Sequence, residues 1–270
     1  MIPISIVDAF TDRPFAGNPA AVCVLPAWPS DEWLQLVGRE MNLSETAFLV
    51  QREGNEFELR WFTPKVEVAL CGHATLASAH ALWESGATRD NTVKFVTRKS
   101  GVLVAVRLDD GQIELNFPPK PASLCAEPDG LLPALGAKAV ALGRNEFDYL
   151  VEVANETEVR SLSPDFAKLL ATDCRGVIVT AKSDDPRFDF VSRFFAPKAG
   201  INEDPVTGSA HCCLAEWWGE KLGKSEMVGY QASERGGIVR VLRDRAQGRV
   251  KLIGRAVTVT TGNLHARPEK

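Results

Sequence analysis

The sequence has no Cys-x-x-Cys pair and no long apolar run. Its 270 residues include six cysteines, and no two of them form a Cys-x-x-Cys pair. Neither a disulfide framework nor a tetrahedral zinc site is therefore expected, and a reducing cytoplasm is the simplest setting. No apolar run approaches the ~18 residues of a membrane span, and the N-terminal stretch lacks the basic start of a signal peptide. We therefore expect a cytoplasmic protein with no membrane partner.

The motifs of nucleotide and hydrolase chemistry are also missing. The chain has no Gly-x-Ser-x-Gly, no P-loop, and no Gly-x-Gly-x-x-Gly after a strand, so we expect no cofactor. A formal net charge of −4 argues against a nucleic-acid partner. The one basic cluster is an arginine series between Arg235 and Arg255. It alternates with aliphatic residues, which favours the solvent-facing side of a hairpin over a polyanion site.

What the sequence does contain is a repeat. "RWFTPKVEVALCGHA" (residues 60–74) and "RFFAPKAGINEDPVTGSA" (residues 193–210) each run from an arginine through Pro-Lys to a glycine that opens an alanine-rich stretch. The two arginines are 133 residues apart and the two glycines, Gly72 and Gly208, are 136 apart. The second copy therefore carries three extra residues, which the comparison places around Glu203 and Asp204. Offsets close to half the chain length predict two copies of one unit.

Each copy predicts several strands around one apolar helix. Residues 95–115 and 230–252 repeat the same pattern of strand, glycine turn, alternating strand, turn and strand. Helices are expected at 30–41 with Ser30 as cap, at 72–85, at 163–171 with Ser163 at its start, and from Gly208 to about residue 223. The proline-rich segment 116–123 predicts the seam. We therefore expect halves at 1–117 and 118–270, with the last residues able to pack back on the first half.

Two similar halves predict a cleft between them, which is the usual place for a small-molecule site. Each central helix starts at a glycine, Gly72 or Gly208, where backbone N–H groups can approach a ligand closely. If both helix starts face the cleft, they form an anion site for a carboxylate or a developing enolate.

Two residues of the first half are candidates for proton transfer. Glu45 stands in "NLSETAFLV", directly before an apolar stretch. The spacing Asn42-x-x-Glu45 also fits a capping box, so the pattern favours a structural cap and an acid/base role equally. His73 follows Gly72, and the expected cleft favours a functional role for it. His80 is expected to be structural, and with no third ligand evident we expect no metal site.

The second half has its own candidates. Asp204 precedes Pro205, so it is either a turn residue or a functional carboxylate. Ser209 follows Gly208 and can either cap the helix or bind a ligand. Cys71 and Thr207 occupy equivalent positions in the repeat. A racemase with two thiol bases would need cysteine at both, so that chemistry is disfavoured.

These residues resemble a known family. The stretches "DAFTDRPFAGNPAAVCVL", "NLSETAFL", "RWFTPKVEVALCGHATLASAHAL", "EDPVTGSAH" and "YQASERGG" are similar to the PhzF-like isomerases of phenazine biosynthesis and cover nearly the whole chain. The resemblance implies an α+β fold shared with diaminopimelate epimerase. That fold has two pseudo-symmetric halves, each a barrel-like, mostly antiparallel sheet around a central helix. It also implies a possible homodimer.

The resemblance further implies a reaction and roles for residues. The activity is a cofactor-independent proton shift within trans-2,3-dihydro-3-hydroxyanthranilate or another small carboxylate. The family's acid/base glutamate falls on Glu45, its histidine on His73, its aspartate on Asp204 and its serine on Ser209; the two glycines of the substrate site are Gly72 and Gly208. Two alternatives stay open: an epimerase, racemase or dehydratase that uses Cys71 with Thr207 or Glu45, and a non-catalytic ligand- or protein-binding homologue.

Overall fold

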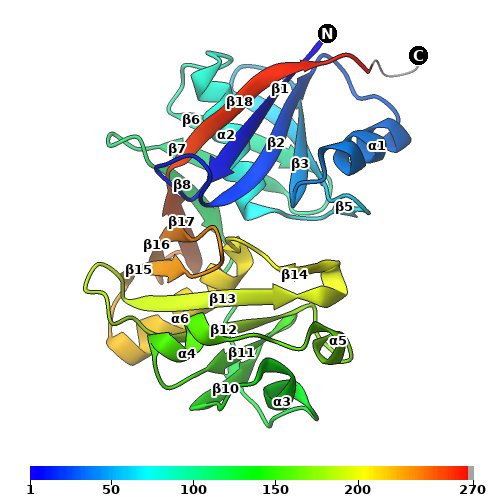
Figure 1. The fold of residues 1–270 in the computed structure, drawn as a ribbon. Helices are drawn as coiled ribbons and strands as arrows, with labels where there is room; N and C mark the ends of the chain where they lie inside the picture. The colour runs from blue at the N-terminus through cyan, green and yellow to red at the C-terminus, as the bar shows by residue number, and fades with distance from the viewer. Residues whose placement is uncertain (267–270) are drawn as a thin grey trace. The chain divides into compact units, whose positions relative to one another are not determined.

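Strands dominate the computed structural model, which describes residues 1–266, and the helices are few, so the fold is α+β (Figure 1). The chain divides into two compact units. Unit 1 holds Met1–Asn116 together with the segment that starts at Ile253, and unit 2 holds Phe117–Leu252. Within residues 1–266, no helix is long and apolar enough to cross a membrane.

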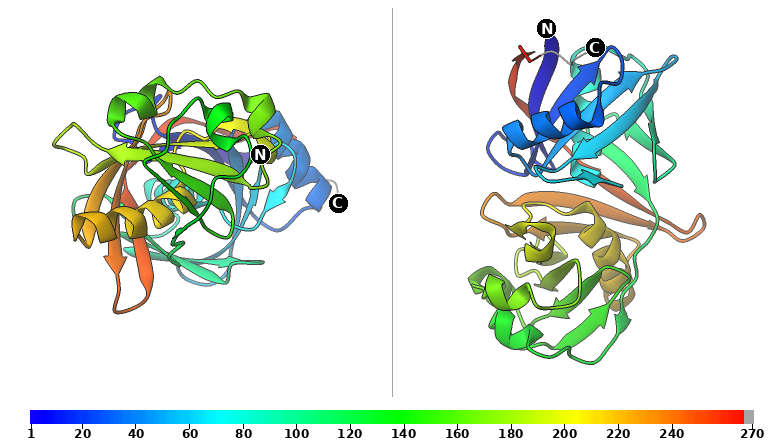
Figure 2. Two further views of the ribbon diagram at one scale, coloured as in Figure 1. Left: turned by 90° about the horizontal axis from the view of Figure 1, so that it is seen from below. Right: turned by 90° about the vertical axis from the view of Figure 1, so that its right-hand side faces the viewer.

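Unit 1 is a mixed sheet in which the two ends of the chain are neighbours. In Figures 1 and 2, β18 runs beside β1, and the two strands pair antiparallel from Ile2–Leu264 to Ala9–Ala256. The pairing continues in the order β18–β1–β2–β3–β4–β6–β7–β8, with β5 beside β4. The strands are β1 Ile2–Ala9, β2 Asn18–Leu25, β3 Glu45–Gln51, β4 Glu56–Phe62, β5 Glu67–Val68, β6 Thr92–Thr97, β7 Val102–Arg107, β8 Ile113–Phe117 and β18 Ala256–Leu264.

Unit 2 repeats this order of pairing. Its strands follow β9–β10–β11–β12–β13–β15–β16 with β14 beside β13, and each parallel or antiparallel step matches the corresponding step of unit 1. The repeat read from residues 60–74 and 193–210 is therefore a repeat of topology. The strands are β9 Ser123–Leu124, β10 Ala141–Arg144, β11 Asp148–Glu152, β12 Gly176–Lys182, β13 Phe190–Ala196, β14 Ile201–Glu203, β15 Glu226–Gln231, β16 Gly237–Asp244 and β17 Arg249–Gly254.

The long helices agree with those predicted from the sequence, and the short ones differ. In α1 (Asp31–Met41), the Ser30 side chain accepts the Trp33 N–H, as expected of its cap. The predicted helix at 163–171 is shorter: α5 spans Phe166–Leu169, and its cap is Asp165 instead of Ser163. The remaining helical elements are α2 Gly72–Glu84, α3 Leu131–Leu135, α4 Glu156–Ser161, the 3₁₀ turn η1 Pro197–Ala199 and α6 Gly208–Leu222.

Helices α2 and α6 are the buried helices that the apolar sequence predicted. Nine of the thirteen residues of α2 are buried, and the helix packs against β1, β2, β3 and β18. Leu76 and Leu82 are fully buried, and each stabilises the fold by about 1.5–3 kcal/mol relative to exposure. In α6, Trp218 stacks on Phe190 of β13 with parallel rings. The same kind of apolar helix is therefore covered by the strands of each unit.

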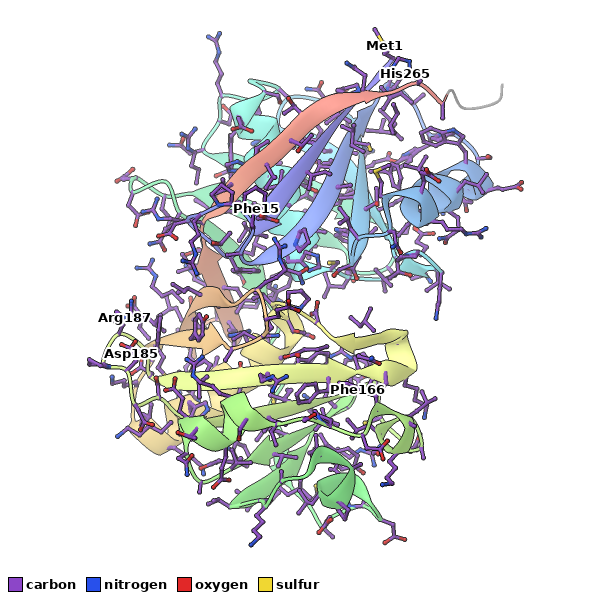
Figure 3. The ribbon with its side chains drawn as sticks, viewed as in Figure 1. Met1, Phe15, Phe166, Asp185, Arg187 and His265 are labelled. Atoms are coloured by element: carbon purple, nitrogen blue, oxygen red, sulfur yellow. The ribbon has the colours of Figure 1, made fainter. Side chains whose placement is uncertain are left out.

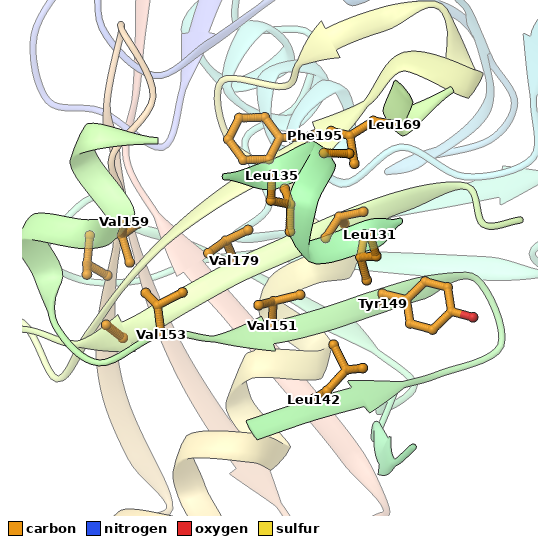
Figure 4. Packing of buried hydrophobic residues seen from close by; sticks show 14 residues of the cluster. Leu131, Leu135, Leu142, Tyr149, Val151, Val153, Val159, Leu169, Val179 and Phe195 are labelled. Carbon is orange, nitrogen blue, oxygen red and sulfur yellow. The ribbon is translucent and has the colours of Figure 1, made fainter. Parts of the chain in front are cut away.

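A second layer of unit 2 is built by its short helices. Figure 4 shows Leu131 and Leu135 of α3 beside Val151 and Val179, which lie on the adjacent parallel strands β11 and β12. Phe195 of β13 belongs to the same cluster. Strands this apolar are typical of a sheet that is covered on both faces.

One ion pair recurs in both units and corrects the repeat alignment. Arg60 of β4 donates from Nε and Nη2 to both oxygens of Glu67, at 2.7 and 2.8 Å, and Arg193 of β13 donates in the same way to Glu203, at 2.7 and 2.8 Å. Glu203 is therefore the counterpart of Glu67. The three extra residues therefore precede Glu203 and lie near Pro197–Ala199. The prediction that the insertion lies around Glu203 and Asp204 is wrong.

Arg243 of β16 is not part of a solvent-facing row. Its side chain is 3% exposed and donates to Glu216 and Glu220 of α6 at 2.7 and 2.5 Å. Gly219 leaves the space for it, because a Cβ atom at that position would lie 2.4 Å from the Arg243 Cδ atom. The sequence prediction holds for Arg245, which is 66% exposed, and is wrong for Arg243.

Candidate active site

Glu45 is the first residue of β3. Asn42 ends α1 in the left-handed conformation, with φ 50°, and its N–H donates to the Gly38 carbonyl. Because the chain enters a strand after this turn, no helix begins at Asn42 and the capping-box interpretation of Glu45 is wrong. The side chain of Glu45 is 17% exposed. It is therefore mostly buried yet still accessible to a small molecule.

His73, in the first turn of α2, contacts Glu45. The His73 Nε2 atom lies 3.2 Å from Glu45 Oε2, and the Nδ1 atom lies 3.1 Å from the Asn18 side-chain nitrogen Nδ2. An amide nitrogen can only donate, so Nδ1 accepts and the ring proton resides on Nε2. Complete burial lowers the pKa of His73 to about 3. The imidazole is therefore neutral, and the contact with Glu45 is a hydrogen bond instead of an ion pair.

Asn18 was not singled out from the sequence, although it lies in the quoted stretch "GNPAAV". It begins β2 after the loop that joins β1 to β2. Asp8 holds this loop by accepting the Phe15 N–H at 2.7 Å, while the Phe15 ring is exposed (Figure 3). Gly17 has a φ of 65°, and a Cβ atom there would lie 2.2 Å from the Ala9 carbonyl oxygen, so only glycine fits. The loop thus fixes where the Asn18 amide meets His73.

Cys71 completes this group. It is the N-cap residue of α2, in an extended conformation with φ −144°, and its Sγ atom lies 3.4 Å from His73 Nδ1. One ligand atom each from Glu45, Cys71 and His73 lie within 4.8 Å of one another. The sequence offered only His73 and His80 as possible metal ligands, and His80 lies farther along α2. The structure thus brings together a carboxylate, a thiol and a neutral imidazole, a set that can transfer a proton or ligate a cation.

In unit 2, Asp204 belongs to a hydrogen-bonded turn before α6. Thr207 Oγ1 donates to Asp204 Oδ2 at 2.5 Å. Gln231 connects the turn: its Nε2 donates to the Asp204 carbonyl at 2.7 Å, and its Oε1 accepts the Thr207 N–H at 2.9 Å. These contacts order the Asp204 carboxylate and occupy the Thr207 hydroxyl. Gln231 was missed because 24 residues separate it from Thr207.

Ser209, in the first turn of α6, has a cationic neighbour. Arg175 donates from Nη2 to Ser209 Oγ at 2.9 Å, and its Nε donates to the buried Asp148 carboxylate at 2.9 Å. Because Asp148 holds the guanidinium by two hydrogen bonds, the serine hydroxyl is oriented by a fixed group. The sequence contains no signal for this contact, since Arg175 and Ser209 are 34 residues apart.

The starts of α2 and α6 share a chemical property. Neither cap residue, Cys71 or Thr207, uses its side chain to accept a helix N–H, and neither first turn contains an acidic residue. The first N–H groups of an α-helix have no partner within the helix and carry partial positive charge. Each helix start, at Gly72 and at Gly208, therefore favours an anion.

The comparisons with known proteins agree on one family. The profile of the family described as "Phenazine biosynthesis-like protein" matches residues 7–262. An "uncharacterized isomerase" of Halalkalibacterium halodurans is 51% identical over 264 residues, which cover 97% of this chain and 98% of that protein. The crystal structure of a PhzF-family phenazine biosynthesis protein from Enterococcus faecalis has a TM-score of 0.92 and 40% identity, covering 98% of this chain and 99% of the other.

More distant structures share the fold alone. A probable proline racemase from Agrobacterium radiobacter K84, solved with bound carbonate, has a TM-score of 0.64 at 13% identity, covering 99% of this chain and 94% of that chain. This agrees with the racemase- and epimerase-like α+β fold that the sequence motifs implied.

Proposed function

Because the chain belongs to the phenazine biosynthesis-like (PhzC-PhzF) family, we propose that it is an isomerase that moves a proton within a small unsaturated carboxylate, with Glu45 as the acid/base. The relatives support an enzyme of the isomerase type. The observation that carries the role of Glu45 is its contact with a neutral His73: the Nε2 proton is directed at one carboxylate oxygen, 3.2 Å away.

This contact suits a carboxylate that must take a proton from carbon and return it. The hydrogen bond from His73 fixes the orientation of the carboxylate, and Asn18 fixes the tautomer of His73. Since the imidazole is uncharged, it orients Glu45 without forming a salt bridge that would hold the carboxylate permanently ionised. A positioned acid/base of this kind typically contributes 10²–10⁴-fold in rate.

The charge that develops on the substrate requires a partner as well. Removing a proton next to a carboxylate creates an enolate-like anion, which the N–H groups at the start of α2 would stabilise. For unit 2 we keep the roles that the motifs imply: Asp204 assists proton transfer, and Gly208 and Ser209 bind the substrate. Arg175, which orients Ser209, becomes a positioning residue of that group.

A second candidate function is favoured by one contact. The Cys71 thiol lies 3.4 Å from His73 Nδ1 and within 4.8 Å of a Glu45 carboxylate oxygen, so a thiol and a carboxylate are both present as candidate bases of an epimerase or racemase. Thr207 is disfavoured as a base because its hydroxyl donates to Asp204. A dehydratase of a small hydroxy acid would need the same two groups.

Proton NMR in D₂O separates these functions. We would incubate the protein with trans-2,3-dihydro-3-hydroxyanthranilate and with a set of cyclic, amino and hydroxy carboxylates. An isomerase gives a product in which hydrogen has moved between carbons. An epimerase exchanges one C–H for deuterium at a single stereocentre, and a binding protein gives neither signal. Product without any movement of hydrogen between carbons would contradict the proposal.

A further inference from the structure

Three different metal-ligating groups meet where β3 begins, beside the start of α2. Glu45 offers a carboxylate, Cys71 a thiol and His73 an imidazole, with one atom of each inside 4.8 Å. We propose that these side chains form a three-ligand site for a thiophilic divalent cation, with Zn²⁺ as the best match, and that the bound cation blocks proton transfer by Glu45. The inhibitory part rests on the proposed function, whereas the cation site does not.

The contact between His73 and Glu45 has the spacing of two ligands of a tetrahedral zinc site. Zinc bonds of about 2.0–2.2 Å to nitrogen or oxygen and about 2.3 Å to sulfur place neighbouring ligand atoms roughly 3.2–3.7 Å apart. The His73 Nε2 and Glu45 Oε2 atoms are already 3.2 Å apart. The Cys71 Sγ atom lies 4.0 Å from the same Nε2 atom but 3.4 Å from Nδ1, so the cysteine side chain has to rotate toward the Glu45 side of the ring to complete the set. Three protein ligands leave the fourth position open.

The contact between His73 and Asn18 also suits a metal. When a cation takes Nε2, the ring proton must reside on Nδ1, and the Asn18 amide needs only a half-turn to accept it through Oδ1 instead of donating through Nδ2. A carbonyl oxygen that accepts the second ring N–H is the usual support of a ligating histidine.

The binding step needs no redox partner. The Cys71 S–H bond breaks, its proton passes to solvent, and the sulfur lone pair forms the bond to the cation. The imidazole proton moves from Nε2 to Nδ1 by exchange with solvent. The helix start at Gly72 favours the negative charge that remains on sulfur. A hard cation such as Mg²⁺ prefers oxygen ligands and would bind this set poorly.

The test measures binding directly. The metal-free protein would be titrated with Zn²⁺ by calorimetry and with Co²⁺ by absorption spectroscopy. We expect one Zn²⁺ per chain and a thiolate-to-cobalt charge-transfer band. Cys71→Ala should remove the band and weaken Zn²⁺ binding more than ~10-fold, and Asn18→Ala should weaken it by ~10–100-fold. Mg²⁺ should not displace Zn²⁺.

The matched control is Cys23→Ala. Cys23 is another buried thiol of unit 1, on β2, and burial raises its pKa to about 12, so it is a poor ligand. This variant should bind Zn²⁺ like the parent protein. Unchanged Zn²⁺ affinity in Cys71→Ala, or a cobalt spectrum without a thiolate band, would overturn the cation site.

Measurements of turnover with and without Zn²⁺ test the cation site and the proposed function separately. Once a substrate is found, Zn²⁺ should inhibit the parent protein competitively and inhibit Cys71→Ala more than ~10-fold less. If the protein binds Zn²⁺ tightly through Cys71 and still turns over fully, the cation site is supported and the catalytic role of Glu45 is contradicted. If turnover requires Glu45 but the protein does not bind Zn²⁺, the proposed isomerase function is supported and the cation site is contradicted.

Discussion

The Nε2 atom of His73 lies 3.2 Å from the Oε2 atom of Glu45, although 28 residues separate them in the chain. The contact joins the first residue of β3 to the first turn of α2. Because burial lowers the pKa of His73 to about 3, the histidine is a neutral hydrogen-bond donor at ordinary pH. The side chain of Glu45 is thereby held in a fixed orientation, which is a property that a proton-transferring group requires.

Glu45→Gln should abolish turnover without unfolding the protein. Glutamine keeps the size of the side chain, and its carbonyl oxygen can still accept the His73 Nε2–H, but it cannot take a proton from carbon. We expect kcat to fall ~10²–10⁴-fold, with thermal unfolding close to that of the parent. Glu53→Gln, an exposed carboxylate of the same unit, is the control and should leave kcat unchanged. Full activity of Glu45→Gln on any substrate of the parent would contradict the assignment.

Cys71→Ala should retain much of the isomerase activity in metal-free buffer. The thiol contacts His73 Nδ1, the nitrogen opposite the one that faces Glu45, so its removal leaves the Glu45–His73 hydrogen bond in place. We expect a loss in kcat/KM of less than ~10-fold, against ~10²–10⁴-fold for Glu45→Gln. A loss as large as that of Glu45→Gln would favour the epimerase chemistry, in which the thiol is one of two bases.

Stability should fall as the solution is acidified below neutral pH. His211 of α6 is buried, with a pKa lowered to about 4 by burial, whereas an unfolded histidine titrates near 6.5. Between these values the unfolded chain binds the extra proton, so the stabilisation present above pH 6.5 is lost as the pH falls toward 4. From pH 7 to pH 5 this one residue removes about 2 kcal/mol from the free energy of unfolding.

Urea unfolding at pH 7 and pH 5 measures this contribution of His211 to the free energy of unfolding. His211→Gln should reduce the difference between pH 7 and pH 5 by about 2 kcal/mol. The exposed His265, labelled in Figure 3, provides the control, and His265→Gln should leave the difference unchanged. An identical pH dependence in His211→Gln and the parent would contradict a neutral buried imidazole.

Arg243→Met should destabilise unit 2 although it replaces a charge by an apolar side chain. The guanidinium is almost fully buried and joins β16 to Glu216 and Glu220 of α6. Without the guanidinium, the mostly buried Glu216 carboxylate loses this partner. Because Glu220 is exposed, we expect the free energy of unfolding to fall by about 1–3 kcal/mol, less than the 3–5 kcal/mol of a fully buried pair. Arg245→Met removes the exposed partner of Glu220 and should cost less than about 1 kcal/mol. Equal urea midpoints for the two variants would show that burial of Arg243 contributes nothing.

The sequence alone determined the elements with strong local patterns. The repeat around Gly72 and Gly208, the two apolar helices that start there, and the Ser30 cap of α1 all follow from periodicity and composition, and the structure confirms them. The motifs "LCGHAT" and "DPVTGSA" were enough to identify the family. Local rules fail at the short helix α5, where Asp165 instead of Ser163 is the cap, because both residue types cap equally well.

Tertiary structure decided which side chains meet, because distance in sequence carries no information about pairing between separate strands and helices. Asn18 reaches His73 across 55 positions, and Arg175 reaches Ser209 across 34. The same packing made Glu45 a strand residue instead of a helix cap, since the left-handed Asn42 ends α1 just before it. It also buried Arg243, which strand alternation alone assigned to solvent, because Gly219 leaves room for the guanidinium against α6.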